Sequence, residues 1–388
     1  MSLTEHNLRD LFYAKNYKYY AKYDNYGSVQ RRHTSFQNNG NVCYCNASLQ
    51  LLLSIKPLCI YLLSKFDKIY GRTKSKSKYK GDILKALFYI IEETYKVEKG
   101  YLCTDTHINL LKKMRKYNST IVINAQNDAH EFLLMLLNYI NVECNRDFNF
   151  PPNFEIILDD KDSKENASEK YWVKYLFRDN SIITDLLGFQ NVSSITCTHC
   201  GHTRHSFEFC LDLGLEFQSE HIQSTSLIDL LRSNIMKSDD FCHLFCPICK
   251  SKQNSCIKKG LYRMPNLYMI IYIKRFKWSY ECTNYFKSRV KKIDTTVLLP
   301  WDGLIDFTSF AYMSNHESLS NSKYLIESFI CHSGNSYNGH YTAVVKHTDG
   351  FYKCNDEKMK KLSNPFNPEN ISDIYLLLLR RCSYFYVE

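Results

Sequence analysis

The chain begins with helical periodicity and ends with strand periodicity. Apolar residues recur at helical spacing within residues 41–66, where Pro57 is expected to stop or kink the helix. Further amphipathic helices are predicted at 83–95, 106–117 and 128–140. After residue 182 the pattern changes to short β-rich runs, at 192–197, 205–215, 267–276, 324–332, 340–346 and 374–380. Helices followed by strands predict an α+β fold.

Three polar segments lie outside these predicted elements. Residues 1–33 are charged and rich in Tyr, and are expected to be an extension. Residues 70–82 are rich in Lys, Ser and Gly, and are expected to form a solvated loop, with a basic docking patch as the alternative. Residues 155–170 are acidic and polar, which predicts a loop or a boundary.

Composition excludes several classes of protein. A chain of 388 residues with 44% hydrophobic residues is long and apolar enough to bury a core, which excludes a disordered chain. The net charge of +10 permits an acidic partner but does not require nucleic acid. Sixteen Cys are too few for a disulfide scaffold, so a reducing compartment is expected, the cytoplasm or the nucleus. We expect neither a signal peptide nor a membrane-inserted segment.

Cys43 follows a polar turn that contains glycine and precedes a predicted helix, so it is expected at that helix's N-terminus. Free backbone N–H groups and the helix dipole favour the thiolate there, and the thiolate is the nucleophilic form of Cys. The same amides, together with the side-chain amide of Asn38, are suited to hold an oxyanion. From this segment alone, a buried structural Cys explains the pattern equally well.

A second polar group lies far along the chain. Gly339 and His340 lead into one predicted strand, and the next predicted strand ends at Asn355 and Asp356, fifteen positions beyond the histidine. Adjacent antiparallel strands would place one of these two side chains beside the imidazole. A Cys nucleophile needs a His base and a third group that orients the His. Together with Cys43, the pattern predicts a thiol-dependent catalytic site.

Two C-x-x-C pairs, separated by 45 residues, indicate a metal site. Their members are Cys197, Cys200, Cys246 and Cys249. Four thiolates form a closed tetrahedral zinc site with no open position for water, so a structural zinc ion is predicted. The long spacer fits two knuckles at the tip of a β-arm. The reserve ligands are His199, His202 and Cys242.

These motifs resemble those of the ubiquitin-specific protease (USP/UBP) family of cysteine deubiquitinases, peptidase C19, from about residue 34 to 381. The similar segments occur in the family's order: a Cys box at 39–50, a helix signature at 126–133, a first finger knuckle at 195–201 with 207–213, a palm strand at 272–276, a His box at 339–343 and a closing strand at 375–380.

The resemblance implies a papain-like core with a helical thumb, a β-sheet palm and zinc-bearing β fingers. It implies hydrolysis of the isopeptide or peptide bond after the C-terminal Gly of ubiquitin, with ubiquitin and ubiquitinated proteins as partners. The implied division of the chain is an extension at 1–33, a catalytic domain at 34–381 (34–180 mainly thumb, 190–262 fingers, 263–381 mainly palm) and a tail at 382–388.

The resemblance also implies catalytic roles for residues at matching positions. Cys43 would be the nucleophile and His340 the general base, oriented by Asn355 or by the adjacent Asp356. Asn38 would donate to the oxyanion.

The resemblance implies a substrate-binding group as well. Asp128 would lie beside the ubiquitin tail and meet a tail arginine. Gly339 would leave room for the diglycine, next to Tyr341 of the same His box. The segment 332–338 would be a blocking loop that moves when ubiquitin binds.

Departures from the family pattern leave alternatives open. Val42 stands where Thr is usual, and Cys45 replaces a common Met, as in a subgroup that depends on WD-repeat activator proteins. The alternatives are a weak or activator-dependent ubiquitin-binding module, and a protease for another ubiquitin-like modifier. A zinc-dependent nucleic-acid binder rests only on the net charge and the two knuckles, and is disfavoured.

Overall fold

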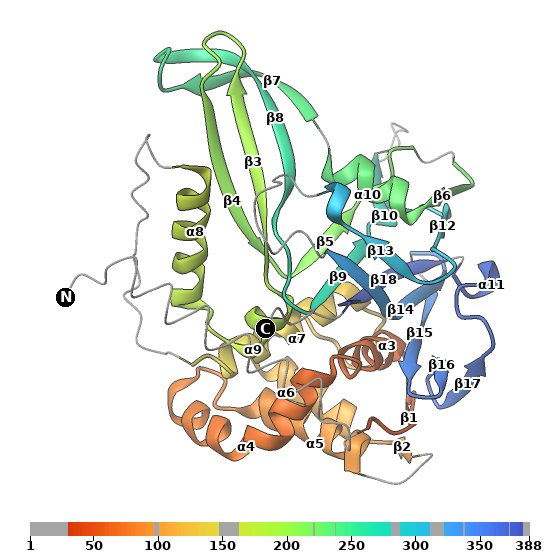
Figure 1. The fold of residues 1–388 in the computed structure, drawn as a ribbon. Helices are drawn as coiled ribbons and strands as arrows, with labels where there is room; N and C mark the ends of the chain where they lie inside the picture. Colours follow the sequence, from red (N-terminus) through yellow and green to blue (C-terminus); the bar gives the residue numbers. More distant parts are fainter. Residues whose placement is uncertain are drawn as a thin grey trace, which may run out of the picture.

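The chain folds into a group of helices followed by two large β-sheets (Figure 1). The computed structural model describes residues 30–96, 101–146, 163–219, 222–236, 238–280, 288–310, 322–336, 338–371 and 373–382. Three predicted segments lie partly outside these ranges. The residues concerned are 1–29 of the expected extension, 337 of the expected blocking loop and 383–388 of the expected tail.

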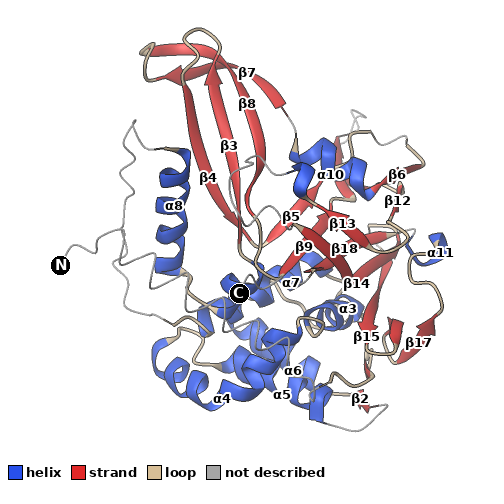
Figure 2. Cartoon of the chain, viewed as in Figure 1, coloured by secondary structure: helices blue, strands red, loops and turns tan. Residues whose placement is uncertain are grey.

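The helices are concentrated in the first half of the chain, coloured blue in Figure 2. They are α3 (Cys43–Leu52), α4 (Lys56–Lys76), α5 (Asp82–Lys96), α6 (Thr106–Tyr117), α7 (Ala129–Glu143), α8 (Lys164–Arg178), α9 (Ile182–Leu187), α10 (Leu227–Ile235), the 3-10 helix η1 (Thr308–Phe310) and α11 (Pro368–Ile371). Among the described residues, no single helix is long and apolar enough to cross a membrane, and α3 with α4 passes that test only as a pair bent by 84°.

The first large sheet has eight strands, in the order β17-β16-β15-β14-β18-β9-β5, with β13 also paired to β14. Its members are β5 (Asp212–Leu215), β9 (Tyr268–Ile273), β13 (Leu304–Asp306), β14 (Lys323–Gly334), β15 (Gly339–His347), β16 (Gly350–Asn355), β17 (Lys358–Leu362) and β18 (Ile374–Arg381). The strand β18 is central, and both faces of the sheet are covered. Its Leu376 and Leu378 belong to the core shared with the helices, whereas Leu377 and Leu379 belong to a second core shared with α10.

The second sheet is a long antiparallel arm of four strands, in the order β4-β3-β8-β7, that extends away from the helices (Figure 1). Its strands are β3 (Phe189–Cys197), β4 (Thr203–Cys210), β7 (Ser238–Cys246) and β8 (Ser251–Arg263). The β3–β4 and β7–β8 turns both lie at its tip (Figure 2). Three two-stranded pairs complete the strands: β1 (Thr34–Phe36) with β2 (Tyr101–Cys103), β6 (Ser224–Ser226) with β12 (Thr296–Leu298), and β10 (Phe276–Tyr280) with β11 (Ser288–Lys292).

The expected break at Pro57 is confirmed. The helix α3 ends at Leu52, and α4 begins at Lys56 with Pro57 in its first turn. Proline has no N–H and a fixed φ, so it interrupts a helix interior but suits a helix start. All ten residues of α3 are buried, which makes this helix the centre of the helical part.

Two loop predictions are wrong. The helix α4 continues to Lys76, so the first half of the expected loop 70–82 is helical, because Ile69 and Thr73 bury one side of this polar segment. The helix α8 begins at Lys164, inside the expected loop 155–170. It is capped by the Ser163 hydroxyl and packs its buried Trp172 against the arm, two features that the acidic composition of the segment concealed.

Candidate active site

Cys43 is the first residue of α3 and is 5% exposed. The preceding turn has positive φ angles at Gly40 and Asn41. Asn38 organises this turn, because its Oδ1 accepts hydrogen bonds from the backbone N–H of Gly40 at 3.1 Å and of Val42 at 3.3 Å. The N-cap residue Val42 provides no side-chain cap, so the first N–H groups of α3 lie beside the thiol without that partner.

His340 and Asn355 are brought together by the antiparallel pairing of β15 with β16. The register pairs Ala343 with Cys354, which places His340 and Asn355 diagonally on one face of the sheet. His340 Nε2 lies 2.7 Å from Asn355 Oδ1, but 3.9 Å from the nearest oxygen of Asp356. Of the two candidates for the orienting residue, Asn355 is the one that hydrogen-bonds to the histidine.

Cys43 lies beside the imidazole of His340 and contributes most to its raised pKa. Together with the hydrogen bond to Asn355, the neighbouring thiol raises the pKa of His340 to about 9 against the opposing effect of burial. At neutral pH the imidazole is therefore protonated and lies between the thiol and the amide oxygen. Such a group supplies a positive charge beside Cys43 and a proton that is ready for transfer.

Asp356 ties the two halves of the site together. Its Oδ2 accepts a hydrogen bond from Asn38 Nδ2, and its Oδ1 accepts one from Asn46 Nδ2, both at 2.8 Å. The carboxylate side chain is only 9% exposed, and the residue has a positive φ of 48°. Asp356 thus holds the turn before α3 and α3 itself against the end of β16. Sequence analysis missed Asn46, although a polar residue three positions after Cys43 lies on the same helix face.

Asp128 caps α7, as its position in the sequence predicts. Its Oδ1 accepts hydrogen bonds from the backbone N–H of His130 at 2.8 Å and of Glu131 at 3.0 Å. Its other oxygen accepts a hydrogen bond from the hydroxyl of Tyr375, whose pKa is raised by burial. The half-buried carboxylate is therefore fixed from both sides before any ligand arrives.

Gly339 is required by the close approach of His332. A Cβ at this position would lie 1.9 Å from His332 Nε2, far inside van der Waals contact. His332 is buried, which lowers its pKa to about 4, so the ring is neutral. Tyr341 is 7% exposed, and its ring lies 4.6 Å from that of His332, so the structure does not bring Tyr341 to the surface of the site.

Sequence analysis also missed Lys292, which anchors the end of β14. Its buried ammonium donates to the carbonyl oxygens of His332 at 2.7 Å and Gly334 at 3.0 Å, and lies 3.2 Å from a carboxylate oxygen of Asp373. Nothing in the spacing of this lysine marks it, because its partners come from other strands.

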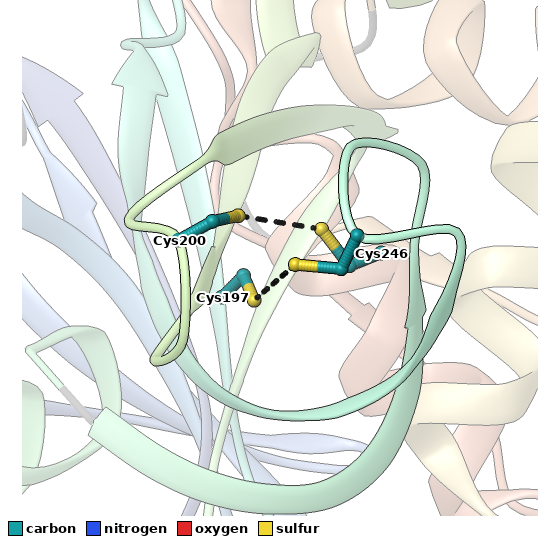
Figure 3. Close-up of side chains that lie close together, drawn as sticks. Cys197, Cys200 and Cys246 are labelled. Carbon is teal, nitrogen blue, oxygen red and sulfur yellow. Dashed lines mark hydrogen bonds between the residues drawn. The ribbon is translucent and has the colours of Figure 1, made fainter.

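The four cysteines of the two C-x-x-C pairs meet at the tip of the arm (Figure 3). Their sulfur atoms all lie within 4.8 Å of one another, with Cys197 Sγ 4.0 Å from Cys249 Sγ and Cys200 Sγ 3.6 Å from Cys246 Sγ. The predicted clustering of these four side chains is confirmed. They form a group that could hold a metal ion, far from Cys43 in the fold.

Comparisons with known proteins agree with this arrangement. A family model described as "Ubiquitin carboxyl-terminal hydrolase" matches residues 34–379. Ubiquitin carboxyl-terminal hydrolase 2 of Rattus norvegicus is 28% identical over 355 residues, which cover 89% of this chain and 54% of the relative. Ubiquitin carboxyl-terminal hydrolase 3 of Homo sapiens is 26% identical over 343 residues, which cover 83% of this chain and 63% of the relative.

The fold is shared with a solved structure described as the SAGA Ubp8/Sgf11/Sus1/Sgf73 DUB module bound to ubiquitin aldehyde. The two structures have a TM-score of 0.66 at 19% sequence identity, over 92% of this chain and 72% of that chain. The match covers 54% of the Rattus norvegicus relative and 63% of the Homo sapiens relative, so the present chain spans a little over half the length of these curated relatives. The family match covers most of the chain, and the chain belongs to the ubiquitin carboxyl-terminal hydrolase family.

Proposed function

We propose that this chain is a thiol-dependent deubiquitinase, which hydrolyses the isopeptide or peptide bond after the C-terminal glycine of ubiquitin. The observation that carries the proposal is the position of His340, which lies beside Cys43 at the start of α3 and hydrogen-bonds at 2.7 Å to Asn355. The family membership supplies the substrate class.

In the proposed mechanism, the Cys43 thiolate attacks the glycine carbonyl carbon, and the C–N bond of the lysine amide then breaks. The protonated His340 donates its proton to the leaving amine, which leaves an acyl-thioester on Cys43. Water, deprotonated by His340, attacks the thioester and releases the ubiquitin carboxylate and the thiol. The raised pKa of His340 supports this order, since the imidazole carries a proton at neutral pH.

The oxyanion formed in both steps would be held by the backbone N–H groups at the start of α3 and by Asn38. An amide side chain has two N–H donors, and Asp356 accepts one of those of Asn38, so Asp356 would fix the direction of the other. On the substrate side, Asp128 would pair with an arginine of the ubiquitin tail.

We assign a structural zinc ion to Cys197, Cys200, Cys246 and Cys249. Zn–S bonds of about 2.3 Å place the four sulfur atoms of a regular tetrahedron about 3.8 Å apart. The observed sulfur–sulfur distances of 3.6 and 4.0 Å fit that geometry. A bound ion would join the β3–β4 turn to the β7–β8 turn and so stiffen the arm. The cysteines whose side chains the structure describes are free thiols, which supports a reducing compartment, the cytoplasm or the nucleus.

The test is a reaction with a ubiquitin probe that carries a C-terminal thiol-reactive group, followed by intact mass measurement. The wild-type chain should gain one ubiquitin, Cys43→Ala should gain none, and Cys45→Ala, a change at a fully buried neighbour in α3, should react as the wild type does. An adduct that persists in Cys43→Ala would overturn the proposal. A parallel reaction with probes of ubiquitin-like modifiers, and one with an added WD-repeat activator, distinguish the two alternatives for the same site.

A further inference from the structure

One face of the helical part carries a dense group of positive charges. It consists of the end of α4, the α4–α5 turn, the start of α5 and the outer side of α6, and we refer to it as the basic face. Its cationic side chains are Lys74, Lys76, Lys78, Lys80, Lys85, Lys112, Lys113, Arg115 and Lys116. All of them are exposed except Lys113, which is half-buried.

The basic face accounts for most of the net charge of the protein. Within residues 74–85 and 112–117, nine Lys and Arg side chains stand against one carboxylate, Asp82. This is an excess of eight charges, whereas the whole chain has a net charge of +10. The rest of the molecule is therefore almost neutral. A net charge of this size, if distributed evenly, would produce only a weak positive potential. In the folded protein most of it lies on one side of the molecule.

Side-chain contacts show that the two segments form a single surface. Lys116 Nζ lies 2.7 Å from a carboxylate oxygen of Asp82, at the start of α5. The hydroxyl of Tyr117 donates to the carbonyl oxygen of Tyr79 at 2.9 Å, and the two rings lie 5.1 Å apart. Viewed down the axis of α6, its four cations lie on the same half of the helix surface. The opposite side carries the buried residues His107, Leu110, Leu111 and Met114.

Aromatic rings lie between the cations. The ammonium of Lys85 lies 5.7 Å from the ring centroid of Tyr70 and 5.9 Å from that of Tyr89, which is 42% exposed. Lys78 and Lys116 lie over the rings of the residues that follow them, at 4.8 and 4.9 Å. The aliphatic side chains of residues 74–89 and 112–117 are all buried. The surface therefore offers ammonium groups and tyrosine rings, without an apolar centre.

We propose that the basic face binds single-stranded nucleic acid through its phosphates, with the exposed ring of Tyr89 available for base stacking. Interfaces with proteins are depleted in Lys and have an apolar core, and insertion into a membrane requires exposed apolar side chains, so the composition of this face favours neither. Exposed lysines with aromatic rings between them match sequence-independent binding to a phosphate backbone.

This surface is distinct from the proposed catalytic centre. The helices α4, α5 and α6 lie at the end of the molecule opposite the tip of the four-stranded arm (Figure 1). The helix α3, which begins at Cys43, lies between these two ends (Figure 1), and none of the nine cations belongs to the site. The inference does not rest on the proposed hydrolysis, so a failure of one leaves the other standing.

The test measures binding of a fluorescein-labelled oligonucleotide of twenty uridines or thymidines by anisotropy, at 50 and 200 mM NaCl. Contact with about five phosphates predicts an affinity that falls about 100-fold between these two concentrations. The variant with Lys74→Glu, Lys76→Glu and Lys78→Glu should bind much more weakly, with a salt effect of about 7-fold if three contacts are lost. Hydrolysis of a ubiquitin–fluorophore substrate by this variant should equal that of the wild type.

The matched control reverses three exposed lysines on β8, with Lys252→Glu, Lys258→Glu and Lys259→Glu, and so changes the net charge by the same amount. It should keep the wild-type affinity and salt dependence. Equal weakening by both variants, or no binding by the wild type at 50 mM NaCl, would overturn the proposal. Binding of polyglutamate or of phosphatidylserine vesicles in place of the oligonucleotide would assign the face to an acidic protein or to a membrane. Glutamine at the same three positions serves as the folding control.

Discussion

Replacing Asn355 by Ala removes one hydrogen bond from His340 and leaves the strand pairing in place. Asn355 is exposed at the end of β16, so its loss creates no cavity in the core. The 2.7 Å bond to Nε2 is, after the neighbouring Cys43, the next largest of the influences that raise the pKa of His340 to about 9. The variant therefore tests the orienting residue while Cys43 stays in contact with the imidazole.

The size of the effect follows from the strength of this bond. A hydrogen bond to a charged group contributes about 1.5–3 kcal/mol. The side chain of His340 is 39% exposed, so water replaces part of the lost interaction, and about 1 kcal/mol remains. One pKa unit corresponds to about 1.36 kcal/mol, so the pKa of His340 should fall by about 0.7 unit. The same free energy lowers kcat/KM at least about fivefold, since the ring also loses its orientation.

The assay is kcat/KM for a ubiquitin C-terminal fluorophore amide, measured from pH 6 to pH 10. Activity of the wild type should fall above about pH 9, where His340 loses the proton that the leaving amine needs. In Asn355→Ala the fall should begin at a pH lower by about 0.7 unit. Asn355→Asp keeps an acceptor oxygen and adds a negative charge, so it should restore the fall to the wild-type pH or above it.

The reasoning is refuted if Asn355→Ala retains both the rate and the pH dependence of the wild type. The comparison variant is Asp356→Asn, because Asp356 lies 3.9 Å from Nε2 but accepts hydrogen bonds from Asn38 and Asn46. It should lower kcat and move the alkaline fall less than Asn355→Ala does, because the charge of Asp356 is the smallest of the influences that raise the pKa of His340. If Asp356→Asn alone lowered the pH at which kcat/KM falls, Asp356 rather than Asn355 would be the residue that orients His340.

Further predictions concern other parts of the structure. Gly339→Ala should abolish most activity and lower the free energy of unfolding by about 1–3 kcal/mol, and adding His332→Ala should restore stability, because the new Cβ would lie 1.9 Å from His332 Nε2. A fall in melting temperature that persists in the double variant would contradict this. Asp128→Ala should cost about 1 kcal/mol in urea unfolding, through loss of the N-cap of α7, and unchanged stability would rule the cap out. Removal of zinc by a chelator, followed by metal analysis, should loosen the arm and weaken ubiquitin binding, whereas kcat at saturating substrate should change little. The raised pKa of His340 means that its charged form stabilises the fold below pH 6.5 and that this contribution is lost as the pH rises through about 9. The difference in melting temperature between the wild type and His340→Ala should therefore be largest at pH 6 and vanish by pH 10.

Local sequence patterns predicted α3, α5, α6 and α7 and most of the strands of the eight-stranded sheet. The range of α6 agrees with its prediction, and α7 begins at the residue after its predicted cap. The helices α8, α9, α10 and α11 were not predicted. The strand β8 is rich in Lys and the helix α8 in Lys and Glu, and both are ordered by contacts with distant segments rather than by an apolar pattern of their own.

Local motifs were enough to identify the chemical groups of the site: a thiol before a helix, a Gly-His pair before a strand, and two C-x-x-C pairs. These are local signals, because a helix N-terminus, a close backbone approach and a metal knuckle each depend on a few adjacent residues. Only the tertiary structure chose Asn355 over Asp356, enclosed Asp356 between Asn38 and Asn46, and joined the basic segment 74–85 to the cations of α6 on one face. Those decisions depend on strand register and on helix packing between residues far apart in the chain, which no local pattern encodes.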